Sequence, residues 1–167
     1  MQLFRIIKHL LYPGWRVRRA FPPGCQRAIT EAIHVSERAH SGEIRFAIEG
    51  ALDGLPLWRG QTARERAIEL FSQLRVWDTE HNNGVLIYVL LADQAVEIVA
   101  DRGIHARASM HTWNAICQHM QAAFASSDFQ IGAVRGIAAL SHSMREHYPR
   151  SRDARNELPN IPVIVRR

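Results

Sequence analysis

The sequence predicts one α/β domain, a three-layer sandwich in which a small mixed β-sheet is covered by helices on both faces. A length of 167 residues favours a single domain, and 47% hydrophobic with 22% charged residues is ordinary globular usage. Residues 43–91 read as strand, helix and strand, a crossover that is expected to be parallel and right-handed. A tight connection at Asp93-Gln94 then makes the next strand an antiparallel hairpin partner.

The strands are predicted from their hydrophobic patterns. Residues 43–49 alternate apolar and polar side chains, which is typical of a half-buried strand. The turn Asn82-Asn83-Gly84 leads into seven consecutive apolar residues, 85–91, which indicates a strand covered on both faces. Residues 96–100 form the third strand. Pro159 and Pro162 make the C-terminal segment an extended tail, or at most an edge strand.

The helices follow from apolar stripes and their boundary residues. The first helix of the domain spans about residues 24–39, after Pro22-Pro23. Thr62 and Glu65 form the pattern of a capping box, which begins the crossover helix. Apolar stripes over 113–124 and 131–144 predict two further helices, the second beginning near Asp128.

Charge divides the chain into three parts. The net charge is +5, but residues 1–20 hold five basic residues and no acid, whereas residues 21–143 carry a net charge of −3. We therefore expect a basic amphipathic extension at 1–23, an α/β domain at 24–148 and an extended tail at 149–167. Because the basic residues lie outside the mildly acidic core, the composition argues against nucleic-acid binding by the folded domain.

The N-terminal segment combines apolar residues at helical spacing with basic side chains. Such a helix either packs on its own domain or lies in a membrane interface, where a neighbouring tryptophan favours the interfacial position. If this segment binds an anionic surface, that surface is a membrane or, as an alternative, a nucleic acid. The contacts would come from Arg5, Lys8, Trp15, Arg16, Arg18 and Arg19.

Several classes of protein are excluded by missing features. The two cysteines, Cys25 and Cys117, form no CxxC pair, and isolated thiols suit a reducing compartment. No apolar run approaches the roughly 20 residues that span a bilayer, and residues 1–20 lack the order of a secretory signal. We find no phosphate-binding glycine loop and no hydrolase or zinc motif. We expect a cytoplasmic protein, with a peripheral position at the inner membrane surface as the alternative.

Polar residues gather where the predicted strands meet. The first two strands begin, and the third ends, at the same edge of the sheet. That topology brings together the candidate metal ligands Glu43, Glu80, Asn83 and Asp101. Carboxylate and amide oxygens are ligands that Ca²⁺ and Mg²⁺ prefer. The alternative is structural, since Asn-Asn-Gly and Asp-Arg-Gly are also ordinary turn sequences and Glu43 could be a solvated strand end.

With its segments placed, the chain resembles the TPM domain family over roughly residues 25–147. The resemblance is carried by five segments in order, namely 41–44, 82–87, 98–104, Trp113 with 124–129, and the glycine pair Gly132 and Gly136. It implies an α/β sandwich, and some members of the family bind divalent cations, notably Ca²⁺, in an acidic cleft. It also implies the weak acid-phosphatase activity ascribed to some members, and the role of others as accessory factors of membrane proteins.

Three hypotheses result. The favoured one is a stand-alone TPM module, without signal peptide or membrane anchor, that is not an enzyme, binds Ca²⁺ or Mg²⁺ and meets a membrane-associated partner. The second is a weak metal-dependent phosphatase with Asp101 or Glu80 as ligand or base. The third is binding of an anionic membrane or nucleic acid through the basic ends. The sequence names neither a substrate nor a partner.

Overall fold

The order of elements confirms the predicted α/β class. The computed structural model describes residues 2–105, 110–150 and 156–166. Its strands are β1 (Glu43–Glu49), β2 (Gly84–Leu90), β3 (Ala95–Ala100) and β4 (Val163–Val165). Its helices are α1 (Gln2–Leu10), α2 (Trp15–Ala20), α3 (Pro23–Glu37), α4 (Gly54–Trp58), α5 (Ala63–Gln73), α6 (Arg102–His105), α7 (Met110–Ala125) and α8 (Phe129–His147).

The sheet is mixed, with the strand order β3-β2-β1-β4. Strands β1 and β2 are parallel, with Glu43 opposite Gly84, and β2 and β3 are antiparallel. Both pairings agree with the crossover and the hairpin expected from the sequence. The C-terminal segment adds β4, a short edge strand that pairs in parallel with β1.

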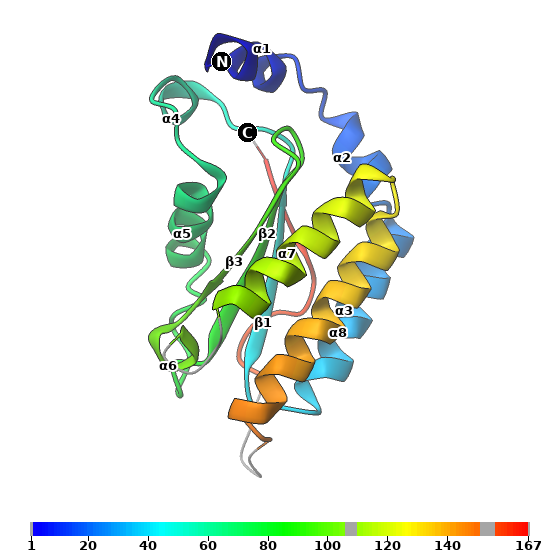
Figure 1. Cartoon of the computed structure of the whole chain (residues 1–167), viewed down its shortest axis with the longest axis vertical. Coiled ribbons are helices and arrows are strands. Elements are labelled where there is room, and N and C mark those ends of the chain that lie inside the picture. The colour runs from blue at the N-terminus through cyan, green and yellow to red at the C-terminus, as the bar shows by residue number, and fades with distance from the viewer. Residues whose placement is uncertain (1, 106–109, 151–155, 167) are drawn as a thin grey trace.

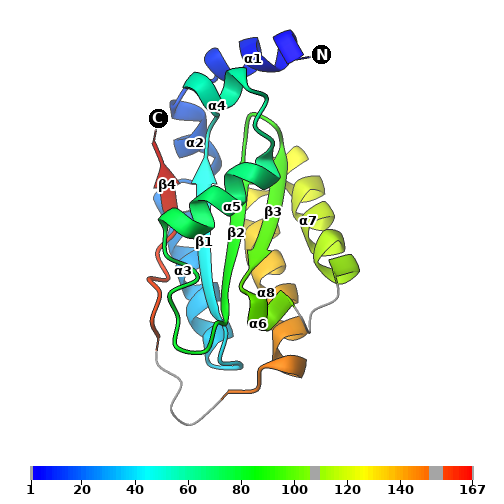
Figure 2. The same ribbon diagram turned by 90° about the vertical axis from the view of Figure 1, so that its left-hand side faces the viewer.

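The sheet buries both of its faces, which makes the predicted three layers. Alternate residues of β1 and β2 such as Phe46 and Ile87 pack with α3, α7 and α8. The intervening residues, including Ala47 and Leu86, pack with α5 and with single residues of α1 and α4. Figure 2 shows α5 in front of the sheet and α3, α7 and α8 behind it. β2 is therefore buried along its whole length, as its unbroken apolar run requires.

Local signals in the sequence place the helices. The Thr62 hydroxyl accepts a hydrogen bond from Glu65 N (3.1 Å), and the Glu65 carboxylate accepts one from Thr62 N (2.7 Å), which is the predicted capping box. Helix α8 begins after Asp128, whose side chain makes no capping hydrogen bond. A Cβ atom at Gly136 would lie 2.3 Å from the Met120 sulfur, so this glycine lets α7 and α8 approach closely.

Side chains of β1 hold the C-terminal segment along the edge of the sheet. The Arg45 guanidinium donates hydrogen bonds to the carbonyl oxygens of Pro159 and Ile161, the latter at 2.8 Å. The Glu43 carboxylate accepts hydrogen bonds from the backbone N–H groups of Glu157 and Leu158. These contacts join residues more than 110 positions apart and bring the chain's end close to the N-terminal helices (Figure 1).

Candidate functional site

The first candidate site is the edge at which β1 and β2 begin and β3 ends. Glu43 N donates a hydrogen bond to the Asn83 carbonyl oxygen (3.1 Å), and Asp101 N donates to the Gly84 carbonyl oxygen (2.9 Å). These bonds place the backbones of Glu43, Asn83 and Asp101 beside one another. The convergence expected from the predicted topology is therefore present at the level of the main chain.

The carboxylate of Glu43 already has protein partners. Its side chain is buried, and Oε2 accepts from Glu157 N at 3.2 Å and from Leu158 N at 3.1 Å. Burial raises the pKa of Glu43, while these two backbone donors act against that rise. The contacts give Glu43 a structural role in anchoring the C-terminal segment.

Glu80 is placed differently from the other three candidate ligands. It is exposed, and its backbone N–H donates to the Glu157 carboxylate at 3.1 Å. Because Glu157 also donates its own N–H to Glu43, Glu80 is joined to the edge through the C-terminal segment. Its own carboxylate faces the surface of the molecule.

Asn83 and Asp101 keep one buried oxygen each without a hydrogen-bond partner in the described part of the chain. Asn83 is 2% exposed, and its amide Nδ2 donates to the Ser41 carbonyl oxygen. Asp101 is 8% exposed, and Oδ1 accepts from Arg102 N at 2.6 Å. Asn83 Oδ1 and Asp101 Oδ2 are the atoms left over. Buried polar atoms in native proteins are usually paired with protein, water or an ion, so each of these two oxygens can accept a hydrogen bond from water or contact an ion.

His40 lies at the same edge. Its Nδ1 accepts a hydrogen bond from Gly42 N at 3.1 Å, and its buried Nε2 has no partner among the described residues. Burial lowers the pKa of His40 to about 4, so the imidazole is neutral at pH 7. Within the described ranges, no three His, Cys, Asp or Glu side chains are grouped closely enough to hold a metal ion.

The second candidate site is the opposite end of the molecule, where α1 packs on the domain. The Arg5 guanidinium contacts the Asp93 carboxylate, with Nη2 at 2.7 Å from Oδ2, and also donates to the Gln61 carbonyl oxygen at 2.8 Å. His9 is fully buried, and its Nε2 lies 2.7 Å from Asp93 Oδ1. Its Nδ1 accepts from Leu52 N at 2.9 Å, so the Nε2 position carries the proton directed at Asp93.

This packing turns the apolar side of α1 away from the domain. Arg5, Ile6 and His9 face inward, whereas Phe4 and its apolar neighbours face outward. Helix α4 lies next to α1 and is exposed as well (Figure 1). We name this surface the α1–α4 apolar face; its exposed members are Leu3 (67%), Phe4 (75%), Ile7 (46%), Leu10 (48%), Leu11 (75%), Trp15 (56%), Leu55 (67%) and Trp58 (59%).

Exposed basic side chains lie on α1 and on the neighbouring α2. Of the contacts predicted from the sequence, Lys8, Arg16, Arg18 and Arg19 are exposed, whereas Arg5 is ion-paired with Asp93. The Arg16 guanidinium lies 5.6 Å from the centre of the Tyr12 ring and 5.8 Å from that of Trp15. These two cation–π contacts hold the Arg16 guanidinium beside the exposed Trp15 indole.

Leu55 and Trp58 are functional candidates that sequence reasoning missed. The glycines and the proline of residues 50–60 are typical of a loop, whereas the structure forms the short helix α4 within this segment. The available signal was composition, because Leu55, Leu57 and Trp58 are large apolar residues in a segment that should otherwise be polar. Leu57 is buried, while the other two are exposed beside α1.

Comparison with known proteins identifies the family. A TPM domain matches residues 19–143, while among curated proteins there is no match. The NMR structure of the BA42 protein from the psychrophilic bacterium Bizionia argentinensis is similar, with a TM-score of 0.74 and 30% identity, covering 85% of this chain and 93% of that one. The N-terminal domain of a protein from P. gingivalis shares the fold, with a TM-score of 0.60 and 16% identity over 77% of this chain and 81% of its own.

The described residues include no helix that is both long and apolar enough to cross a membrane. The TPM match covers most of the chain, and it begins within α2 and ends within α8. The chain therefore belongs to the TPM domain family.

Proposed function

We propose that this TPM-domain protein is a non-enzymatic module that docks on an anionic membrane surface through its α1–α4 apolar face. The observation that carries the proposal is the orientation of α1, whose apolar side points away from the domain. A helix that only stabilised its own domain would bury that side. Contiguous exposed apolar surface on a folded protein marks an interaction site.

The composition of the face matches a lipid interface. An interfacial helix buries its apolar side at the boundary of head groups and acyl chains, and tryptophan prefers that depth. Trp15 and Trp58 are both more than half exposed at this end. Lys8 and Arg16 add positive charge, and each basic residue near an anionic surface contributes about 1 kcal/mol. No acidic residue occurs in residues 1–20 to oppose this attraction.

The contacts of Arg5 and His9 hold α1 in this orientation before any membrane is met. Because the helix is already ordered, docking does not have to bear the cost of folding it. The same face could serve a membrane-associated protein, which is the accessory role that the family resemblance implies. A vesicle assay separates the two, since a protein partner is absent from it.

The test is sedimentation with vesicles of phosphatidylcholine, with and without phosphatidylglycerol. The wild type should bind the anionic vesicles, and binding should weaken as salt is raised. Replacing Phe4 and Leu11 with serine should lower the affinity by at least about 100-fold, because burial of each side chain is worth roughly 1.5–3 kcal/mol and each 1.4 kcal/mol is a factor of about ten. The matched control replaces Trp77 and Ile161, which are 50% and 66% exposed away from this face, with serine. Equal losses in both double variants, or no binding by the wild type, would refute membrane docking.

We further propose that the opposite edge of the sheet binds a divalent cation, Ca²⁺ or Mg²⁺. The unpaired buried oxygens Asn83 Oδ1 and Asp101 Oδ2 support this, since both are oxygen ligands of the kind these ions take. Glu43, whose carboxylate accepts two backbone hydrogen bonds, and the exposed Glu80 add negative charge near this edge. With few charged ligands, we expect weak binding, on the order of millimolar.

The cation proposal is tested by thermal unfolding in Ca²⁺, Mg²⁺ and Zn²⁺. A ligand that binds only the folded protein raises the melting temperature, and Asp101→Asn should abolish that rise. Asp78→Asn is the control, because Asp78 is exposed in the loop after α5. A wild type that shows no shift at millimolar metal would refute the site. Phosphate-ester hydrolysis that Asp101→Asn abolishes would instead favour the weak metal-dependent phosphatase.

A further inference from the structure

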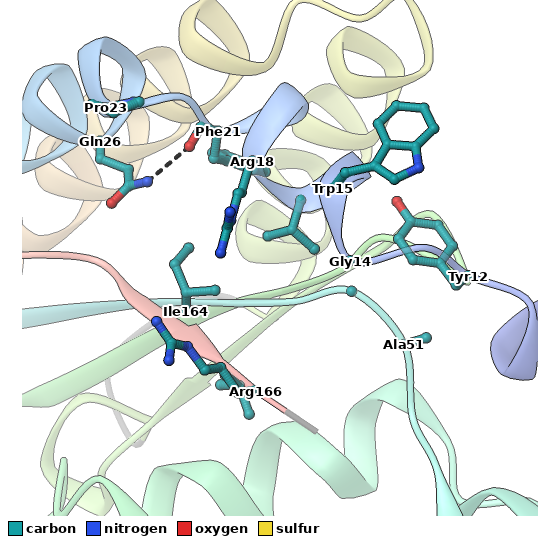
Figure 3. Close-up of a pocket in the computed structure, with 13 residues that line it drawn as sticks. Tyr12, Gly14, Trp15, Arg18, Phe21, Pro23, Gln26, Ala51, Ile164 and Arg166 are labelled. Atoms are coloured by element: carbon teal, nitrogen blue, oxygen red, sulfur yellow. Dashed lines mark hydrogen bonds between the residues drawn. The ribbon is translucent and has the colours of Figure 1, made fainter.

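A cavity of about 800 Å³ lies between α2 and the carboxyl ends of β1 and β4. Gly50 and Ala51, just past β1, form one part of its wall, and Ile164 and Arg166 at the end of the chain form another (Figure 3). Helix α2 covers it from above. Its volume falls in the usual range of small-molecule sites, roughly 300–1,000 Å³. In open α/β sheets, ligands bind outside the carboxyl ends of the parallel strands, which is the position of this cavity.

Two arginines supply the charge of this cavity. Arg18 extends from α2 toward β4, and Arg166 lies on the strand side of the same space (Figure 3). Within the described part of the chain, neither guanidinium has an ion pair or hydrogen bond, and none of the described lining residues is acidic. Two unpaired guanidinium groups at one cavity create a positive potential that attracts an anion, and each can form two parallel hydrogen bonds with an oxyanion.

The remaining wall is apolar and aromatic. Val17 of α2 and Phe21, which directly follows α2, are buried, and Ile164 of β4 lines the same cavity. Tyr12 and Trp15 close the end of the cavity nearest α1 (Figure 3). The occupant therefore needs an apolar or planar body in addition to its charged group.

Gln26 is a polar lining residue whose amide already makes a hydrogen bond within the protein. Its amide Nε2 donates to the Phe21 carbonyl oxygen at 2.8 Å, so this donor is used within the protein. The two guanidinium groups are the charged donors of the cavity, and the Tyr12 hydroxyl and the Trp15 indole N–H are neutral donors among its lining residues. A Cβ atom at Gly50 would lie 2.8 Å from a Val17 methyl group, so the glycine keeps the end of β1 close beneath α2.

We propose that this cavity binds an organic anion, in which a phosphate or carboxylate group contacts Arg18 and Arg166 and an apolar body lies against Val17 and Ile164. The inference rests on the cavity and on Arg18 and Arg166; of the α1–α4 apolar face, only Trp15 also lines the cavity. The ligand could be a soluble molecule or the head group of a single lipid, since both carry the same chemistry.

Calorimetric titration of the full chain with phenyl phosphate, benzoate and short-chain phosphatidylglycerol below its micelle concentration tests this proposal. Arg18→Gln and Arg166→Gln should each weaken binding about tenfold, which corresponds to about 1.4 kcal/mol. Arg19→Gln is the matched control, because Arg19 is exposed next to Arg18 and does not line the cavity. Binding of phenyl phosphate or benzoate identifies a soluble anion as sufficient, whereas binding of the lipid alone identifies a head group.

Two results would overturn the proposal. One is the absence of binding by all three probes at millimolar concentration. The other is an equal loss in Arg18→Gln and Arg19→Gln, which would mean that only general charge attraction is at work. The variant with serine at positions 4 and 11 separates this site from membrane docking, since it should bind soluble anions normally even if it no longer sediments with vesicles.

Discussion

The carboxyl group of Glu37 makes the stability of the protein depend on pH. Glu37 Oε2 accepts a hydrogen bond from Asn160 Nδ2 at 2.8 Å, and Oε1 lies 3.5 Å from Ile44 N, so the residue joins α3 to β1 and the C-terminal segment. Burial, and secondly the charge of Glu43, raise the pKa of Glu37 from 4.5 to about 7. The folded protein therefore binds more protons than the unfolded chain between these two pH values.

The sign and size of the effect follow from linkage. Where the folded state binds more protons, the free energy of unfolding falls as pH rises, here between about 4.5 and 7. A shift of roughly 2.5 pH units corresponds to at most about 3.4 kcal/mol, and residual solvent contact reduces this to roughly 1–3 kcal/mol. Glu37→Gln cannot ionise, so it should be more stable than wild type by this amount at pH 8 and equally stable at pH 4.5.

His40 acts in the opposite direction and has to be separated from Glu37. Its pKa is lowered from 6.5 to about 4 by burial, so acidification through this range destabilises the folded state. The two effects oppose each other in the wild type, and its stability should change little between pH 5 and 6.5. The Glu37→Gln variant lacks the compensating group and should lose stability as pH falls through that window.

The assay is thermal unfolding at pH 5, 6, 7 and 8 for wild type, Glu37→Gln and the exposed control Glu31→Gln. For a chain of this size, 1 kcal/mol corresponds to about 2–4 °C in melting temperature. The difference between Glu37→Gln and wild type should grow with pH, while that of Glu31→Gln stays constant. A Glu37→Gln difference that is the same at pH 5 and pH 8 would refute the reasoning.

Two further predictions concern stability. Asp93→Ala should lower the free energy of unfolding by about 2–4 kcal/mol, because it leaves Arg5 and buried His9 without their carboxylate partner. It should also speed amide hydrogen exchange in α1. Unchanged exchange in α1 would contradict the role of Asp93 as the anchor of this helix. Gly84→Ala should lower the midpoint of urea unfolding strongly, since its Cβ would lie 1.9 Å from the Val76 carbonyl oxygen and the backbone would have to move. A midpoint within error of the wild-type value would show that the backbone at Val76 can move to make room for the methyl group without a large loss of stability.

The C-terminal segment illustrates where sequence reasoning reaches its limit. Its prolines indicated an extended tail or edge strand, and β4 is a short edge strand. Nothing local in the sequence identifies its partner, because the contacts come from Glu43 and Arg45, more than 110 positions away. The parallel pair β1 and β2 could be predicted, since the crossover connecting them is continuous in sequence.

Helix α1 shows a different limit. Its periodicity predicts a helix, and the usual rule would turn the apolar stripe inward. The opposite orientation depends on Asp93, which lies in the turn between β2 and β3 and pairs with Arg5 and His9. The ion pair of Asp93 with Arg5 and buried His9 forms only when the folded chain brings these residues together. The sequence therefore identifies the charged residues of α1 but does not show which way they face. The sequence predicts Arg5 as a membrane contact, whereas in the folded chain Arg5 pairs with Asp93 and anchors the helix.

The acidic and the basic parts of the chain lie at opposite ends of the sheet. The acidic candidate site lies where β1 begins at Glu43, and the basic cavity lies just past its end at Glu49. Seven residues of strand separate them by about 20 Å, beyond the Debye length of about 8 Å at physiological salt. Asp101→Asn and Arg18→Gln should therefore have additive effects on stability and independent effects on cation and anion binding. A change in anion affinity on addition of Ca²⁺ would mean instead that the rigid sheet couples its two ends, which would make the cation a regulator of the basic end.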